Sequence, residues 1–206
     1  MSTSIAHNRA PKKRNYRLGK RATQQQETRR RIVEAAVDLH THLGPARTTV
    51  AQIAERAGVQ RHTYYAHFPD DRSLFLACSA LSLGRDPLPD VEAWSSLPAG
   101  RERLRHGLEQ LYAWYRRNET VTASILRDAE VHEITREIVG ERMVPTFARA
   151  HHVLGEGLGS EAAALLGVAL QFGSWRTLSS SHEDPGAAAL MASAIAGLDR
   201  QSSSSS

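Results

Sequence analysis

The sequence predicts an all-α protein, and three observations support this fold class. Apolar residues recur at helical spacing in successive segments of the chain. No segment alternates apolar and polar residues as a half-buried strand would, and we find no internal repeat. Glycine and proline gather between the periodic segments, where they end helices and form turns. We therefore expect a series of helices joined by short connections.

Composition narrows the class of protein further. The chain has 206 residues, 41% of them hydrophobic and 23% charged, which is ordinary for a globular protein that buries a core. It contains no apolar run long enough to span a membrane, and residues 1–30 are too polar for a signal peptide. The single cysteine, Cys78, excludes an internal disulfide and favours a reducing compartment. These features predict a cytoplasmic protein with no membrane segment.

Charge is distributed unevenly along the chain. Residues 1–80 hold 14 Lys and Arg against 6 Asp and Glu, a balance of +8, whereas residues 81–206 hold 12 against 16, a balance of −4. A basic front and an acidic back suit a domain that binds a polyanion, joined to a second domain that does not touch it.

The N-terminal elements follow from the pattern. Residues 1–24 have no hydrophobic period and many Lys and Arg, so we expect a disordered basic arm that follows DNA phosphates or merely keeps the chain in solution. An amphipathic helix is predicted from Thr23 or Gln24 to Leu43, and Gly44 and Pro45 end it.

A pair of short helices comes next. Thr49 caps the first helix and Gln52, three residues on, completes a capping box. Gly58 supplies a turn residue that tolerates positive φ, and a second helix is expected from about Gln60 to Phe68. Two short helices around a glycine turn form a helix-turn-helix, whose second helix can enter the major groove of DNA. From spacing alone, a surface αα-hairpin of any helical protein is an equally good interpretation.

A resemblance favours the first interpretation. Residues 49–74 resemble the N-terminal signature of the tetracycline-repressor (TetR) family of transcription regulators, in which the residues below recur at fixed offsets. The matching positions are Thr49, Val50, Ile53, Ala54, Ala57, Gly58, Val59, Thr63, Tyr64, Tyr65, His67, Phe68 and Leu74. The resemblance covers about 50 residues and implies a three-helix DNA-binding head over residues 25–80.

The resemblance also implies roles for individual residues. Arg61 and His62 become candidate base readers, and an arginine can bind guanine O6 and N7 in a bidentate pair. Tyr64 and Phe68 are expected to point into the core of the head. Phosphate contacts that set the register are expected from Thr49, Thr63, Tyr65 and His67.

Two positions depart from the family pattern. Asp71 stands where the family usually has a lysine that meets a phosphate. An acid there would repel the DNA backbone, and Arg72 is a candidate replacement for that contact. Gln60 stands where a serine often caps the recognition helix, so the helix start is expected to be weaker, although Gln60 remains a candidate DNA contact.

The rest of the chain reads as a helical body over residues 81–200. A fourth helix begins near Asp71, and residues 84–100 read as a linker or surface loop. Further helices are expected at 98–117, 119–128, 130–154 with a kink or split at Pro145, 161–178 and 184–198, before a disordered serine tail at 201–206.

The resemblance implies that this body encloses an effector pocket and forms a homodimer. Candidate ligand contacts are Trp114, Tyr115, Arg127, His132, Met143, Phe147, Phe172 and Trp175, although each is also an ordinary candidate for a helical core. Small residues crowd the last two predicted helices, where the family places a four-helix dimer interface. A two-fold dimer matches a palindromic operator.

Enzymatic, metal and cofactor chemistry find no support in the sequence. Motifs for nucleophilic serine, zinc hydrolysis, phosphate binding and paired cysteines do not occur. His40 and His42 lie two apart on a helix, and His151 and His152 are adjacent, so neither pair shares a helix face suited to a metal. We therefore expect no enzyme activity, no metal and no cofactor.

The sequence thus predicts a homodimeric, ligand-released transcriptional repressor that binds double-stranded DNA at a palindromic operator. Its effector is expected to be a small apolar or aromatic molecule. One alternative is a constitutive or architectural DNA-binding dimer without an effector. Another is a helical small-molecule-binding or catalytic protein that has lost DNA binding, for which Asp71 is the best support.

Overall fold

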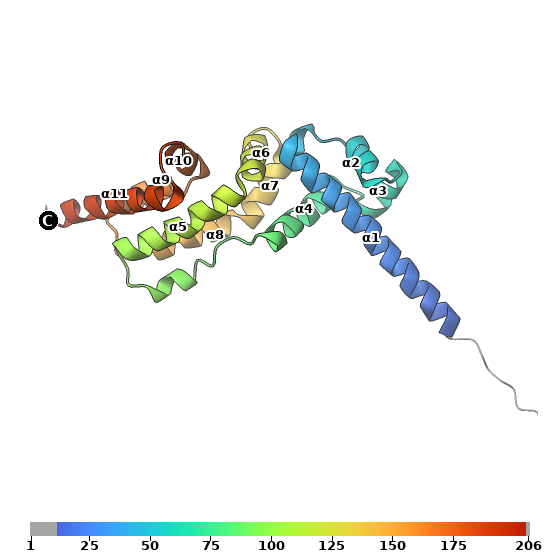
Figure 1. Cartoon of the computed structure of the whole chain (residues 1–206), viewed down its shortest axis with the longest axis horizontal. Helices are drawn as coiled ribbons and strands as arrows, with labels where there is room; N and C mark the ends of the chain where they lie inside the picture. The colour runs from blue at the N-terminus through green and yellow to red at the C-terminus, as the bar shows by residue number, and fades with distance from the viewer. Residues whose placement is uncertain (1–11, 205–206) are drawn as a thin grey trace, which may run out of the picture.

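The computed structural model describes residues 12–204, and the side chains between residues 19 and 200. Every regular element in this part of the chain is a helix, as expected from the sequence. The helices are α1 (Lys12–His42), α2 (Val50–Ala57), α3 (Arg61–His67), α4 (Asp71–Arg85), α5 (Arg101–Arg117), α6 (Glu119–Ala129), α7 (Glu133–Arg142), α8 (Val144–Leu154), α9 (Ser160–Ala169), α10 (Phe172–Leu178) and α11 (Asp184–Ser204), with 3-10 turns η1 (Pro45–Arg47) and η2 (Ala93–Ser96). Figure 1 shows α1 to α3 at one end of the molecule and α9 to α11 at the other.

The head is built from α1 to α4 around its own core. Ile32 and Ala36 of α1, Ile53 of α2, Tyr64 of α3 and Leu74 of α4 are buried together. Thr49 and Gln52 form the predicted capping box, and Gly58 ends α2 in the left-handed conformation at φ 64°. Tyr64 and Phe68 are buried in the head core, as predicted. The local signals of the sequence therefore produce the predicted helix pair.

The beginning of α1 corrects one expectation. Residues 12–24 belong to α1 rather than to a disordered arm, while residues 1–11 lie outside the described part. Pro11 directly precedes the helix, and most of residues 12–24 are the good helix formers Lys, Arg, Leu, Ala and Gln, which accounts for the early start. The predicted absence of an apolar face agrees with the structure where side chains are described, because every residue from Gly19 to Glu27 is exposed. Figure 1 shows this half of α1 projecting from the head.

The body has a second core, centred on α5 and α11, which lie side by side in Figure 1. Leu104, Leu108 and Leu111 of α5 pack there with Ala188 and Ile195 of α11. The expected split at Pro145 is present, since α7 ends at Arg142 and α8 begins at Val144 with Pro145 in its first turn. The small residues of α11 allow its close approach to α5.

The expectation of one helix over residues 161–178 was wrong. The chain breaks between α9 and α10 at Leu170 and Gln171. Two tyrosines of α5 donate to the carbonyls freed by the break, Tyr112 Oη to Ala169 O at 2.9 Å and Tyr115 Oη to Leu170 O at 2.7 Å. Because both tyrosines belong to α5, more than 50 residues earlier in the chain, the local sequence does not predict the break between α9 and α10.

The C-terminal end and the linker also differ in detail. α11 continues to Ser204 instead of giving way to a tail at 201, because no glycine or proline follows Gly197. The predicted linker is present between α4 and α5, but it contains the buried Trp94, whose Nε1 donates to Gln110 Oε1 at 2.8 Å. Among the described residues, no helix combines the length and apolarity that crossing a bilayer requires.

Candidate DNA interface and ligand cavity

α3 separates its side chains into a buried and an open set. Tyr64 and Phe68 point into the head core, with 1% and 0% of their surface exposed. Arg61, His62 and Tyr65 are exposed, and Tyr65 keeps 53% of its surface free. These three side chains form no hydrogen bond or ion pair with any residue that the structure describes. The helix therefore offers donors and an aromatic ring to a partner outside the chain.

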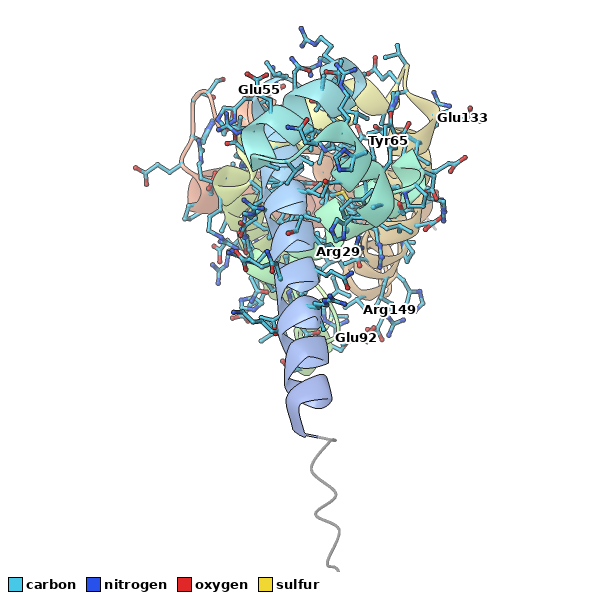
Figure 2. All side chains as sticks on the ribbon, turned by 90° about the vertical axis from the view of Figure 1, so that its right-hand side faces the viewer. Arg29, Glu55, Tyr65, Glu92, Glu133 and Arg149 are labelled. Carbon is cyan, nitrogen blue, oxygen red and sulfur yellow. The ribbon has the colours of Figure 1, made fainter. Side chains whose placement is uncertain are left out.

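α1 holds α3 in place from behind. Arg29 donates from Nη1 to the carbonyl of His67 at 3.2 Å, and its guanidinium lies 4.1 Å from the centre of the Phe68 ring. Both contacts fall at the end of α3, where carbonyl groups lack helical partners. Figure 2 shows Tyr65 and Arg29 on the side of the head that faces the viewer. The orientation of α3 is thus fixed by the head alone.

The remaining predicted DNA contacts around α3 vary in their availability. The Thr49 hydroxyl already donates to Gln52 Oε1 at 2.9 Å, so a phosphate would compete for it. Gln60 occupies the N-cap of α3 without a side-chain capping bond, which agrees with the weak cap expected from the sequence. Thr63 and His67 are half-buried.

The structure engages Arg72 elsewhere. Arg72 Nη1 lies 3.2 Å from Glu137 Oε2, and Nη2 pairs with Glu141, so both bonds tie α4 to α7. Asp71 is exposed in the first turn of α4, a position where the helix dipole favours an acid. The substitution of an acid for the family lysine thus has a local rationale, and Arg72 is not a free replacement.

A second region of interest is the junction between the head and α6. Ser124 Oγ donates to Thr41 O at 3.0 Å, and the carboxylate of Asp128 accepts from the backbone N–H of Ala46 at 2.9 Å. Arg127 Nε donates to Asp128 Oδ1 at 2.8 Å. Burial alone would raise the pKa of Asp128, but the hydrogen bonds from Arg127 and Ala46 outweigh it and lower that pKa. The carboxylate therefore stays ionised and pins the turn after α1.

Gly44 is required at this junction. Its φ of 98° is a conformation that residues with a side chain rarely adopt. A Cβ at this position would also collide with the Asp128 carboxylate and the Arg127 guanidinium. The sequence suggested only that Gly44 ends α1, and the close approach of α6 adds a second reason for glycine.

A cavity of about 100 Å³ lies directly beside this junction, enclosed by α1, α4, α6 and α7. Its wall is mostly apolar, and the head and the body both contribute to it. The lining residues are Val37, His40, Pro45, Phe75, Cys78, Ser79, Ser82, Leu83, Asp86, Trp114, Asn118, Val121, Thr122, Ile125, Leu126, Thr135, Ile138, Val139, Arg142 and Met143. Any molecule bound there would touch both regions at once.

His40 is the buried ionisable group of the cavity wall. Only 6% of its surface is exposed, and its ring lies 5.0 Å from the ring of Phe75. Burial lowers the pKa of His40 to about 4, with a further contribution from His132 and partial opposition from Asp128. His40 is therefore a neutral imidazole at neutral pH, with one donor and one acceptor nitrogen.

The cavity contains few of the predicted ligand contacts. Of the eight candidates, Trp114 and Met143 line it. Tyr115, Phe147, Phe172 and Trp175 instead form an aromatic cluster in the body core, with ring centres between 5.3 and 6.2 Å apart. Aromatic residues at helical spacing fill cores as readily as they line pockets, and here they fill the core.

The two polar candidates lie near the cavity but outside its wall. Arg127 belongs to the junction with Asp128 and Leu43 O. His132 lies 5.6 Å from Phe75, and its Nδ1 is 2.7 Å from Thr135 Oγ1. They act behind the wall rather than in it.

Sequence reasoning missed His40 and Thr122 as cavity residues. A signal for His40 existed, because it stands on the apolar face of α1 close to Ala36 and Leu39, where a polar residue is unusual. Nothing local marks Thr122, since its position beside the cavity depends on how α6 packs against α4. No group of three or more His, Cys, Asp or Glu suited to a metal occurs among the described residues.

These elements define a class of protein. It has a helix-turn-helix head, whose second helix exposes polar side chains, and a helical body, with a cavity at the junction between them. Residues 32–78 match the family model described as "Bacterial regulatory proteins, tetR family". The head of this chain is thus similar to the DNA-binding domain of that family.

Two named transcriptional regulators are similar to parts of this chain. The chain is 32% identical over 124 residues to the HTH-type transcriptional regulator AcrR of Shigella flexneri, covering 58% of this chain and 54% of AcrR. It is 50% identical over 52 residues to the HTH-type transcriptional regulator TtgR of Pseudomonas putida, covering 25% of each chain. The matches thus span about half of AcrR and a quarter of TtgR.

Solved structures share the fold. A Mesorhizobium loti MAFF303099 protein assigned to the TetR family superposes with a TM-score of 0.61 at 20% identity, covering 84% of this chain and 97% of the other. The transcriptional regulator FadR from Bacillus subtilis, solved in complex with stearoyl-CoA, superposes with a TM-score of 0.58 at 16% identity, covering 81% and 96%. At these identities the likeness concerns the fold alone.

Proposed function

We propose that this chain is a homodimeric transcriptional repressor that binds a palindromic operator and is released from it by a small ligand. The observation that carries the proposal is the division of α3 into a buried and an open side. Its open polar side chains, Arg61 and His62, have no partner among the described residues, and the head core fixes their helix. Unpaired donors on a rigid helix suit the readout of base edges in the major groove.

The charge of α1 supports the DNA-facing orientation of the head. Lys20, Arg21 and Arg31 are exposed on the same helix that holds α3. Arg30 is engaged with Glu27 and Glu34 and is less available. Exposed Lys and Arg beside a recognition helix bind backbone phosphates and fix the register of the protein on the duplex.

Homodimerisation through α9 and α11 is supported by two exposed apolar stripes. Ala164 and Val168 lie one turn apart on the open side of α9, and Leu190 and Ala194 do the same on α11. Val168 keeps 47% and Leu190 46% of its surface exposed. Residues 185–198 contain no charged residue. An uncharged apolar surface on two packed helices suits a second copy of the chain.

Release by a ligand follows from the position of the cavity. The cavity wall combines residues of α1 and α4 in the head with residues of α6 and α7 in the body. A ligand that binds better when these helices stand further apart would shift the population towards that state and reorient the head. The expected coupling is about 1–3 kcal/mol, equivalent to a roughly 5–150-fold change in operator affinity.

Selection of bound duplexes from a random pool tests the proposal. We expect a palindromic sequence, and Arg61→Ala should lose the preference at one base pair in each half-site. Arg176→Ala, which removes an exposed arginine from α10, is the charge-matched control and should retain the full preference. Binding without any sequence preference would replace the repressor with an architectural DNA-binding protein. Absence of DNA binding at low salt would refute both.

A further inference from the structure

We propose that the ligand of the cavity between α1, α4, α6 and α7 is a small aromatic molecule with a neutral hydroxyl group, for which phenol is the minimal probe. The inference rests on the proposed function, in which this cavity is the effector site, and it names the chemical class of the effector. His40 and Thr122 carry the argument, because they are buried polar side chains of the wall that have no hydrogen-bond partner among the described residues.

Both side chains lack an internal partner. His40 and Thr122 are buried, with only 6% and 4% of their surfaces exposed. Neither side chain forms a hydrogen bond with any residue in the described range. Among the described residues, every fully enclosed side-chain nitrogen or oxygen has a hydrogen-bond partner. The unpartnered polar atoms of His40 and Thr122 are therefore not fully enclosed, and both residues line the cavity. A buried polar group without a partner costs free energy that a hydrogen-bonding ligand recovers.

The rest of the wall selects an aromatic ring. Phe75 and Trp114 offer flat surfaces, and Ile125 and Val139 close the space from α6 and α7. The volume of about 100 Å³ is of the same order as the roughly 150 Å³ engineered cavity that takes up benzene. The volume therefore suits one small ring rather than a long chain.

The electrostatics of the wall favour a neutral hydroxyl over a carboxylate. Burial keeps His40 neutral, since its pKa is lowered to about 4, so it offers no cation to an acid. Asp86 also lines the cavity, and its hydrogen bond from Arg117 lowers its pKa and keeps it anionic. Arg142, the cation of the wall, is exposed to solvent, so a carboxylate buried beside His40 and Asp86 would lose its hydration without a buried partner charge. A hydroxyl both donates and accepts, which matches the two nitrogens of a neutral imidazole.

Calorimetric titration of the full chain with phenol, toluene and benzoate tests the inference at neutral pH. Phenol and toluene have nearly the same shape and differ in the hydroxyl group. We expect phenol to bind about tenfold more tightly than toluene, as one well-placed hydrogen bond allows. His40→Phe should abolish this preference by weakening phenol alone, because it preserves the ring against Phe75. His182→Phe makes the same exchange at an exposed position and should leave the preference unchanged.

The wild-type titrations decide the inference even if His40→Phe does not fold. Equal affinity for phenol and toluene, tighter binding of benzoate, or no binding of phenol at millimolar concentration would each overturn it. A separate measurement of DNA affinity distinguishes the two proposals. If phenol binds with the expected preference but leaves DNA binding unchanged, the ligand class stands and ligand-released repression fails.

Discussion

Two groups of aromatic residues, one on α3 and one in the body, look alike in the sequence but differ in their hydrogen bonding in the structure. On α3, Tyr64 is buried while its neighbour Tyr65 is half open and lies among polar side chains without internal partners. In the body, Tyr115 and Trp175 are buried and donate to Leu170 O and Asp184 Oδ1. The hydroxyl of Tyr65 thus has no partner among the described residues, whereas the hydroxyl of Tyr115 and the indole N–H of Trp175 already donate within the chain.

The comparison shows that the partnering of polar atoms, rather than aromatic content, distinguishes the candidate binding sites of this chain from its core. Aromatic rings cluster in the body because they fill volume efficiently, and their hydroxyl and indole groups are satisfied internally. Open donors remain on α3 and around His40 in the cavity. The predictions below contrast satisfied with open groups, beginning with the largest expected effect.

Truncation of the body cluster should cost the most stability. Trp175→Ala removes a fully buried ring and its hydrogen bond to Asp184, so we expect a loss of about 3–5 kcal/mol in the free energy of unfolding. Tyr65→Ala, at a residue that is 53% exposed, should change stability by no more than about 0.5 kcal/mol. Urea denaturation of both variants measures the difference, and similar losses would refute the contrast.

His40 should make stability depend on pH. The pKa of its imidazole is about 4 in the folded protein and 6.5 in the unfolded chain, so the unfolded state binds more protons between these values. Stability should therefore fall as pH drops from 6.5 towards 4, by about 3 kcal/mol at roughly 1.4 kcal/mol per pKa unit. Denaturation at pH 7 and pH 5 should show a smaller difference for His40→Phe than for wild type, while His182→Phe should behave as wild type.

Loss of an open donor on α3 should affect DNA binding rather than stability. Arg61→Ala should reduce discrimination at one base pair by about 1–3 kcal/mol. Tyr65→Phe removes a candidate phosphate contact and should weaken all sequences alike. Fluorescence anisotropy with the selected operator and a scrambled duplex separates these effects. Equal losses for Arg61→Ala on both duplexes would exclude a base-reading role.

The α2 cap should have an intermediate effect on stability. Thr49→Ala removes both the hydroxyl that accepts from the Gln52 N–H and half of the capping box, for a loss of about 1 kcal/mol. Thr49→Ser retains the hydroxyl and should remain within a few tenths of a kcal/mol of wild type. Thermal denaturation monitored by circular dichroism measures both variants. An unchanged Thr49→Ala protein would show that the cap contributes nothing.

The smallest effect distinguishes two roles of Arg72. Its pairs with Glu137 and Glu141 are exposed, so Arg72→Ala should cost at most about 1 kcal/mol of stability. Because these pairs occupy the guanidinium, the salt dependence of DNA binding should stay the same. A decrease of about one in the slope of log K against log salt would instead assign Arg72 to a phosphate.

The head was predictable because its determinants are local. Thr49 and Gln52, three residues apart, form the capping box, and Gly58 ends α2 in the conformation that the turn requires. The cavity was not predictable in the same way. His40, Phe75 and Ile125 become neighbours only when α1, α4 and α6 pack, and the break after α9 depends on Tyr112 of α5. Long-range packing of this kind leaves no periodic signature, so the sequence could not separate aromatic residues of the body core from residues that line the cavity.

The position of Cys78 allows the opening of the junction between head and body to be followed by thiol labelling. It is the single cysteine of the chain, it lines the cavity, and burial raises the pKa of its thiol to about 12. Its reaction with a thiol reagent therefore requires both entry into the cavity and ionisation against that burial. The rate of Cys78 labelling therefore measures how often the cavity opens, and no residue has to be substituted to introduce a probe.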